Sequence, residues 1–225
     1  MSSLKFTFLF FITLLISVSA GAKSFVEFLV VDKVWPDHKW GHVSLRVKDD
    51  DQDLIFDFGR YGKMWGFFDT EGDPVLRVWK NANAEHTKYQ KAGNPKIHAV
   101  HFSVSDREAQ NILNYYENLT RGIKPYESNE HLDYYNLGSP AFHAINHNCT
   151  TLSIAAFHAG APRAQINDSA YAQGDGLYWW ARAKATKFDY NPRIKRWGHI
   201  WWPKDLLNNL RAQFIAKGLA TESIE

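Results

Sequence analysis

Short hydrophobic runs alternate with polar clusters through the first half of the chain. Residues 24–104 contain β-branched and aromatic runs, and clusters of glycine, aspartate and asparagine separate them. This pattern is typical of β-strands joined by turns. The sequence therefore predicts about five strands, at Phe25–Val34, His42–Val47, Leu54–Phe58, Pro74–Trp79 and Ile97–Val104.

After residue 105 the hydrophobic pattern becomes helical. Apolar residues at 109, 112, 113 and 116 repeat with the period of an α-helix, and Ser105 followed by two acids marks its start. We predict a helix over Asp106–Thr120, and another of about three turns that begins at Cys149 and stops at Gly160. Further helices are predicted at Gly176–Ala185 and, after Pro203, at Lys204–Lys217.

Residues 121–140 hold glycine, proline, asparagine and serine without a clear period. They are predicted to form a long connection, with at most a short turn of helix, that borders the active site. A run of strands followed by helices indicates the α+β class, with an antiparallel β-sheet packed against helices.

The N-terminus has the three parts of a secretory signal peptide. Lys5 precedes the uncharged run of residues 6–18, and Ala20-Gly21-Ala22 supplies small residues for cleavage. The apolar run is shorter than the roughly 20 residues that span a bilayer, which argues against the alternative of an uncleaved anchor. We expect residues 1–22 to be a signal peptide and residues 23–225 a single exported domain, periplasmic or secreted.

Charge does not identify a partner. Removal of residues 1–22 takes only Lys5 from the 26 lysines and arginines, so 25 basic residues remain against 24 acidic ones. A balance of this kind predicts neither a nucleic-acid partner nor a polybasic membrane tether.

Cys149 is the only cysteine, so no intramolecular disulfide can form. A spare thiol is vulnerable to oxidation outside the cytoplasm. At a helix N-terminus, however, unpaired N–H groups and the helix dipole lower a thiol's pKa and suit it to nucleophilic catalysis. We predict that Cys149 is a nucleophile; the alternative is a buried cysteine that acts as a small hydrophobic residue.

His42 is the best candidate for the base among ten histidines, because it opens an alternating strand directly after Gly41. Its rivals His143 and His147 flank the cysteine and form an i, i+4 pair that could also be a weak metal site. No carboxylate or further cysteine stands at ligand spacing, so we predict neither a metal nor a cofactor. His199, in Gly198-His199-Ile200, is an alternative base that would follow the cysteine in the chain.

Asp57 is a lone acid inside an apolar strand, and a buried acid needs a partner. It is the candidate for the group that orients the imidazole of His42. In an antiparallel hairpin the two residues share a face only if paired residue numbers add to an odd sum, such as 99 or 101. The alternative is an exposed Asp57 on an edge strand.

The segments Gly41-His42-Val43 and Asn148-Cys149-Thr150, with an acid on the strand between them, resemble motifs of the circularly permuted NlpC-type papain-like superfamily. This branch includes permuted bacterial cell-wall peptidase relatives and the lecithin:retinol acyltransferase group, and the resemblance covers about residues 40–160. It implies a papain-like core with Cys149 as nucleophile, His42 as base and Asp57 as third polar residue. The family often has His, Asn or Gln at that third position.

The resemblance also implies acyl transfer through a Cys149 thioester. With export, the nearest amide substrate is the stem peptide of peptidoglycan, which favours an amidase or endopeptidase. Lipid or protein acyl groups are the other substrate class of the superfamily. An inhibitor or immunity protein is a conceivable partner, and the sequence predicts no oligomeric state.

Two further classes remain open. One is a non-catalytic exported binding protein with a papain-like shell. The other is a secreted glycoprotein, because the acceptor pattern occurs at Asn118, Asn148 and Asn167. Nine tryptophans suggest either carbohydrate stacking or, as we predict, core packing; the candidates for stacking are Trp179, Trp180, Trp197, Trp201 and Trp202.

Overall fold

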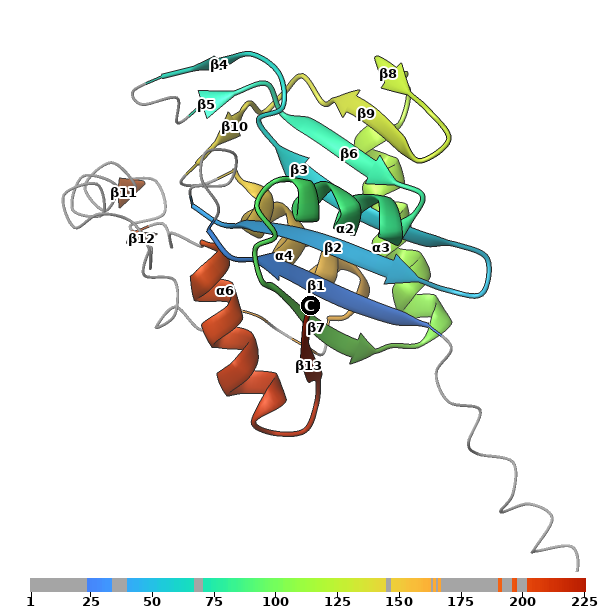
Figure 1. Ribbon diagram of the computed structural model, residues 1–225, viewed down its shortest axis with the longest axis vertical. Coiled ribbons are helices and arrows are strands. Elements are labelled where there is room, and N and C mark those ends of the chain that lie inside the picture. Colours follow the sequence, from blue (N-terminus) through green and yellow to red (C-terminus); the bar gives the residue numbers. More distant parts are fainter. Residues whose placement is uncertain are drawn as a thin grey trace, which may run out of the picture.

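The computed structural model describes residues 24–33, 40–66, 71–144, 147–162, 164, 166, 190–191, 196–197 and 202–225. Its centre is an eight-stranded antiparallel sheet with the order β13-β7-β1-β2-β3-β6-β9-β8 (Figure 1). The strands are β1 (Phe25–Val31), β2 (His42–Lys48), β3 (Asp53–Gly59), β6 (Val75–Trp79), β7 (Ile97–Ser103), β8 (Glu127–Ser128), β9 (Leu132–Asn136) and β13 (Thr221–Ile224).

Two small sheets accompany the main one. One contains β4 (Met64–Trp65), β5 (Glu71–Gly72) and β10 (Phe142–His143). The other is the pair β11 (Tyr190–Asn191) and β12 (Arg196–Trp197). Figure 1 shows β4, β5 and β10 beside the ends of β3 and β6.

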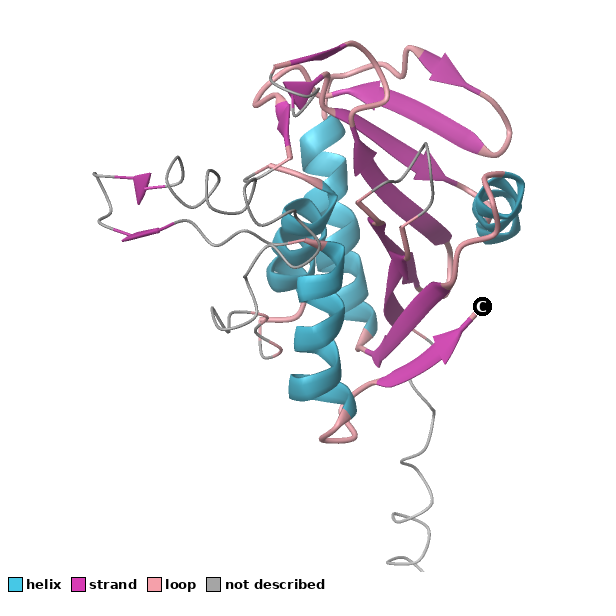
Figure 2. Cartoon of the chain, turned by 60° about the vertical axis from the view of Figure 1, so that its left-hand side comes forward, coloured by secondary structure: helices cyan, strands magenta, loops and turns pink. Residues whose placement is uncertain are grey.

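Helices cover the two faces of the main sheet unequally. The helices α3 (Asp106–Thr120), α4 (Cys149–Gly160) and α6 (Pro203–Leu210), the last continued by a π-helical turn at Arg211–Ile215, lie on one face. The short helix α2 (Ala82–Lys91) lies on the other (Figure 2). The larger hydrophobic core fills the space under α3, α4 and α6, and a smaller cluster lies on the α2 face.

Successive side chains of a strand point to opposite faces of a sheet, so β2 contributes residues to both faces. Val43, Leu45 and Val47 are fully buried in the larger core, whereas the buried His42 and Ser44 alternate with them and face α2. The strand therefore uses one set of side chains for packing and presents polar groups on the other face.

The predicted α+β class with an antiparallel sheet is confirmed. All five predicted strands are present, and α3 occupies the predicted range with Ser105 and Glu108 forming a capping box. The third predicted helix begins at Cys149, and the last one starts one residue early, at Pro203. The helix predicted at Gly176–Ala185 and the signal peptide at residues 1–22 lie outside the described residues.

Several elements of the fold were not predicted from the sequence. The connection predicted at residues 121–140 contains β8 and β9, whose alternation is masked by polar residues such as Asp133 and Asn136. The helix α2 has little amphipathic character, and its buried residues include an acid, Glu85. The C-terminal strand β13 completes the sheet edge beside β7.

Within the part of the chain that the structure describes, no helix has the length and apolar character needed to cross a membrane.

Candidate active site

The register of β2 and β3 brings His42 and Asp57 to the same face. Ser44 pairs with Asp57 and Leu45 with Phe56, so paired residue numbers add to 101, an odd sum. The Nε2 atom of His42 lies 2.6 Å from Oδ1 of Asp57, and both side chains are buried. The alternative of an edge position for Asp57 is wrong, because β3 lies between β2 and β6.

Asn148 fixes the start of the helix that carries the cysteine. Its Oδ1 accepts the N–H of Thr151 at 3.0 Å, and Oγ1 of Thr151 accepts the N–H of Asn148 at 2.9 Å. Reciprocal capping of this kind makes Cys149 the first residue of α4. The predicted position of the thiol at a helix N-terminus is therefore confirmed.

The side chains of Cys149 and His42 lie close enough together for each to shift the pKa of the other. Since Asp57 occupies Nε2 of the ring, Nδ1 is the nitrogen that remains for the sulfur. The backbone N–H of Val43 also lowers the pKa of the Cys149 thiol. Three residues from two strands and one helix thus form a continuous series from carboxylate to imidazole to thiol.

Four groups surround the carboxylate of Asp57. Besides His42, Arg77 of the neighbouring strand β6 forms an ion pair with Oδ2, and the hydroxyl of Tyr61 donates to Oδ1 at 2.7 Å. The indole N–H of Trp79 lies 3.5 Å from Oδ2. Burial disfavours the charge of Asp57, but the Arg77 guanidinium and the His42 ring outweigh it and hold the pKa of this carboxyl well below its usual range.

Asp57 shifts the pKa of the His42 imidazole, and His42 in turn shifts the pKa of the Cys149 thiol. Burial lowers the pKa of His42, but the Asp57 carboxylate and the Cys149 sulfur together raise it to about 9. Burial raises the pKa of Cys149, yet the charge and hydrogen bond of His42 lower it overall below its ordinary value. This arrangement favours a thiolate–imidazolium pair, the nucleophilic state of a cysteine.

The sequence reasoning missed Tyr61 and Arg77. Burial raises the pKa of Tyr61 well above its usual value, so the phenol keeps its proton and can donate to Asp57. The Arg77 guanidinium also stacks over the Tyr61 ring, 3.5 Å from its centroid. A usable signal was present: Arg77 is a lone cation inside the apolar run Val75–Trp79, just as Asp57 is a lone acid in its strand.

Glu85 adds a second buried acid on the α2 face. Its side chain is fully buried, and Oε1 accepts a hydrogen bond from the Ser44 hydroxyl at 2.8 Å. Burial and the nearby charge of Asp57 raise the pKa of Glu85 to about 7. Glu85 is therefore an acid that changes charge near neutral pH within the same polar layer.

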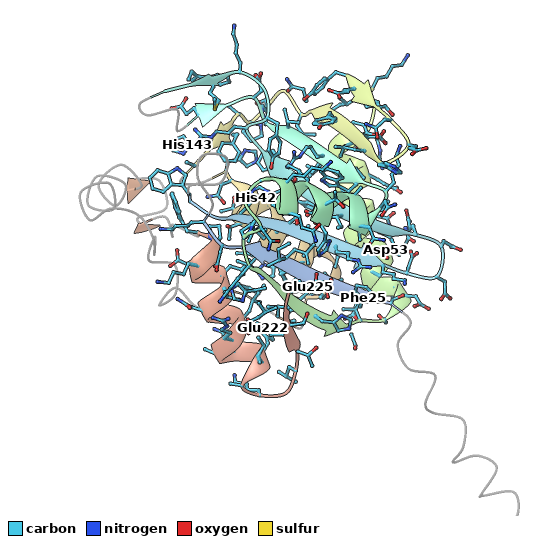
Figure 3. The ribbon with its side chains drawn as sticks, viewed as in Figure 1. Phe25, His42, Asp53, His143, Glu222 and Glu225 are labelled. Carbon is cyan, nitrogen blue, oxygen red and sulfur yellow. The ribbon has the colours of Figure 1, made fainter. Side chains whose placement is uncertain are left out.

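The other candidate residues lie elsewhere or carry no role at this site. The backbones of His143 and His147 pair with each other, and Nδ1 of His147 bonds to the carbonyl of Ala141 (Figure 3 labels His143). Figure 3 places His42 at the start of β2, where the bond to Asp57 holds it. His199 lies outside the described residues. Among those that are described, no group of three or more His, Cys, Asp or Glu side chains is placed to hold a metal ion.

Only some of the tryptophan and glycosylation candidates belong to the residues that the structure describes. Trp202 is buried at 5% exposure, as core packing predicts, whereas Trp179, Trp180 and Trp201 and the side chain of Trp197 lie outside the described residues. Asn148 is also buried, and its amide donates to the carbonyl of Ala144 at 2.9 Å. A glycan on Asn148 is therefore incompatible with the capped helix. Asn118 is exposed on α3, and Asn167 lies outside the described residues.

Comparison with protein-family models, with curated proteins and with solved structures gave no match. The functional argument therefore depends on the residues of the site and on their geometry.

Proposed function

We propose that this protein is an exported cysteine hydrolase with a papain-like core of the circularly permuted NlpC type. The observation that carries the proposal is the order Asp57–His42–Cys149: the carboxylate is hydrogen-bonded to the imidazole, and the imidazole lowers the pKa of the thiol, which lies at the first residue of α4. A nucleophile, a base and an orienting acid in this order are the parts that acyl transfer requires. Support for the core comes from the antiparallel sheet that carries the histidine and acid ahead of the cysteine-bearing helix.

In the proposed reaction, the Cys149 thiolate attacks the carbonyl carbon of an amide and forms a C–S bond. The protonated His42 then gives its proton to the leaving nitrogen as the C–N bond breaks, which leaves a thioester. A water molecule attacks the thioester, and His42 takes its proton. Release of the carboxylic acid restores the thiolate, and Asp57 holds the imidazole in one orientation throughout.

The oxyanion of the tetrahedral intermediate would be stabilised by N–H groups in the first turn of α4. The N–H of Thr151 is already engaged by Asn148, but those of Cys149 and Thr150 bond to no other described residue. These two N–H groups lie at the positive end of the helix dipole. They are the donors that we propose for the oxyanion.

We propose peptidoglycan stem peptides as the substrate and an amide of the stem as the bond that is cut. This part of the proposal depends on the expected signal peptide and on the resemblance of the motifs, and it implies an amidase or endopeptidase. The chemistry at Cys149 would be the same for lipid or protein acyl groups, so the test must distinguish substrate from mechanism.

The test is digestion of purified peptidoglycan by the mature protein, with Cys149→Ala and His42→Ala as comparisons. Fragments with a new stem-peptide amine, identified by mass, should appear with the wild type alone. The rate of Cys149 alkylation by iodoacetamide is measured on the same preparations.

The two readouts separate the hypotheses. Fast alkylation without peptidoglycan cleavage would move the substrate to lipid or protein acyl groups. Slow alkylation together with no cleavage would contradict the enzyme proposal and favour a non-catalytic binding protein.

A further inference from the structure

A cavity of about 240 Å³ lies close to the proposed catalytic residues, at one end of the main sheet. Its lining comes from the start of β6, from the end of β9 and from the connections that follow β3 and precede β6 and β8. The residues that line it are Tyr61, Gly62, Asp73, Val75, Tyr126 and Asn136.

The strand register relates this cavity to His42. Gly59 pairs with Val75, and Val75 pairs with Asn136. Continuation of the β2–β3 register by two residues beyond Ser44↔Asp57 places His42 opposite Gly59. The four residues thus form a row across four strands, and strands about 4.8 Å apart put Val75 about 10 Å from His42.

Tyr61 is the side chain shared by the cavity and the catalytic residues. Its hydroxyl lies 2.7 Å from Oδ1 of Asp57 and 3.2 Å from Nε2 of His42. The ring packs onto Gly59, where a Cβ atom would lie only 2.6 Å from Cε2 of the tyrosine. Tyr61 therefore separates the cavity from the buried carboxylate while the two remain adjacent.

Asp73 gives the cavity its charge. It is the only carboxylate among the six lining residues. Its Oδ2 accepts the N–H of Lys63 at 2.7 Å, while Oδ1 has no hydrogen-bond partner among the residues that the structure describes. Gly62 allows this close approach, since a Cβ there would lie 2.6 Å from Oδ2.

An exposed aromatic ring completes the lining. Tyr126 is 56% exposed and lies close enough to Asp73 for the carboxylate to affect its ionisation. A carboxylate and an aromatic ring that line one cavity are a combination that can bind an ammonium group, through a charge-assisted hydrogen bond and a cation–π contact. Arg77, a cation whose charge reaches Tyr126, is already paired with Asp57.

We propose that this cavity binds a primary ammonium group of the substrate, with Asp73 as its carboxylate partner. The inference rests on the proposed function, because it takes Cys149 and His42 as the reacting centre. It adds that the substrate carries an ammonium group at a distance from the bond that reacts, on the side of Tyr61 that lines the cavity. An α-ammonium at a peptide N-terminus and a side-chain ammonium share this chemistry.

Binding can be tested separately from turnover with ¹⁵N-labelled Cys149→Ala protein. The probes are Nα-acetyl-lysine amide, its neutral isostere Nα-acetyl-norleucine amide, and alaninamide, and the readout is the shift of the Gly62 and Asn136 amide resonances. We expect one of the ammonium probes to bind about tenfold more tightly than the neutral one. The tighter of the two shows whether the ammonium is α or side-chain.

Asp73→Asn in the same background should abolish this preference, because the amide still accepts the Lys63 N–H but carries no charge. Asp51→Asn makes the same change in the turn at the opposite end of β2 and β3 and should retain it. Should Asp73→Asn fail to fold, Tyr126→Ala at an exposed position should weaken the ammonium probe alone. Equal binding of charged and neutral probes, no shift at these amides, or an unchanged preference in Asp73→Asn would overturn the inference.

Because these measurements use protein without the thiol, they do not depend on hydrolysis. If the peptidoglycan digestion failed while the ammonium preference held, only the proposed reaction would be lost.

Discussion

The two faces of the central sheet bury different kinds of side chain. Towards α3, α4 and α6 the strands bury aliphatic and aromatic residues, such as Val43, Leu45 and Phe56. Towards α2 they bury Ser44 and Asp57 together with His42, in contact with ionisable groups of neighbouring elements. One face thus supplies most of the hydrophobic free energy of folding, whereas the other holds, beside a smaller hydrophobic cluster, charges whose burial costs free energy.

On the α2 face, hydrogen bonds compensate only part of the free-energy cost of burying polar and charged groups. Within the described residues, Nε of Arg77 and Oε2 of Glu85 are buried without a hydrogen-bond partner. Natural proteins keep such groups where function needs a shifted pKa or a fixed side-chain orientation. The comparison suggests that the apolar face could be changed without effect on Cys149, whereas changes on the polar face should affect chemistry.

The largest expected effect comes from the polar face. His42→Ala removes the proposed base and the proposed partner of the thiolate, so for the proposed peptidoglycan cleavage we expect kcat/KM to fall roughly ten-thousand-fold. Stability should fall as well, because His42 is a buried partner of Asp57, although Asp57 keeps its ion pair with Arg77. Comparison of kinetics with thermal unfolding checks both statements. A loss below about tenfold would mean that His42 is not the base.

Arg77→Met should destabilise the folded protein through the polar face of the sheet. It leaves the fully buried Asp57 without its main counter-charge, so we expect a loss of about 3 to 5 kcal/mol in the free energy of unfolding. Urea unfolding at neutral pH provides the measurement. The matched control is Arg107→Met on α3, where the structure records no ion pair, and it should lose far less. Equal losses would show that the Asp57–Arg77 pair has no special role.

Leu45→Ala tests whether a change on the apolar face affects stability alone. The side chain is fully buried in the larger core, and truncation should cost between about 2 and 5 kcal/mol. Under conditions in which the variant remains folded, the alkylation rate of Cys149 should match the wild type. A strong change in that rate would mean that the two faces are coupled.

The smallest effect concerns Glu85. Its pKa is raised to about 7 by burial and by the charge of Asp57, so the folded state holds its proton more firmly than the unfolded state. This contribution to stability is present at acidic pH and is lost as pH rises through about 7. Glu85→Gln should therefore match the wild type near pH 5 and exceed it by at most about 3 kcal/mol near pH 8. Urea unfolding at both pH values gives the difference; a gain that did not depend on pH would point to packing instead.

The sequence predicted those parts of the fold that local patterns encode. The five long strands and α3 followed from hydrophobic runs and from the Ser105 cap. The helix start at Cys149 followed from the apolar pattern, and Asn148 caps it in the structure. The strands β8, β9 and β13 were missed because they lie near the sheet edges or carry polar residues, so little alternation is visible.

The site required information that is not local. His42 and Asp57 were recognisable as polar residues at unusual positions in strands, but the sequence allowed either parity of the register. Arg77 became part of the site only because β6 pairs with β3 and places it directly opposite Asp57. Tyr61 reaches the site by folding back over Gly59, a contact that no periodicity encodes.

The most direct test of the account is the pH dependence of Cys149 alkylation by iodoacetamide, in the wild type and in His42→Ala. The account predicts that the wild-type rate rises to its plateau below the ordinary thiol pKa of about 8.5, because His42 stabilises the thiolate. In His42→Ala the midpoint should move upward to about 8.5 or above, since burial then acts without its counter-charge. Superimposable profiles for the two proteins would contradict the claim that His42 activates Cys149.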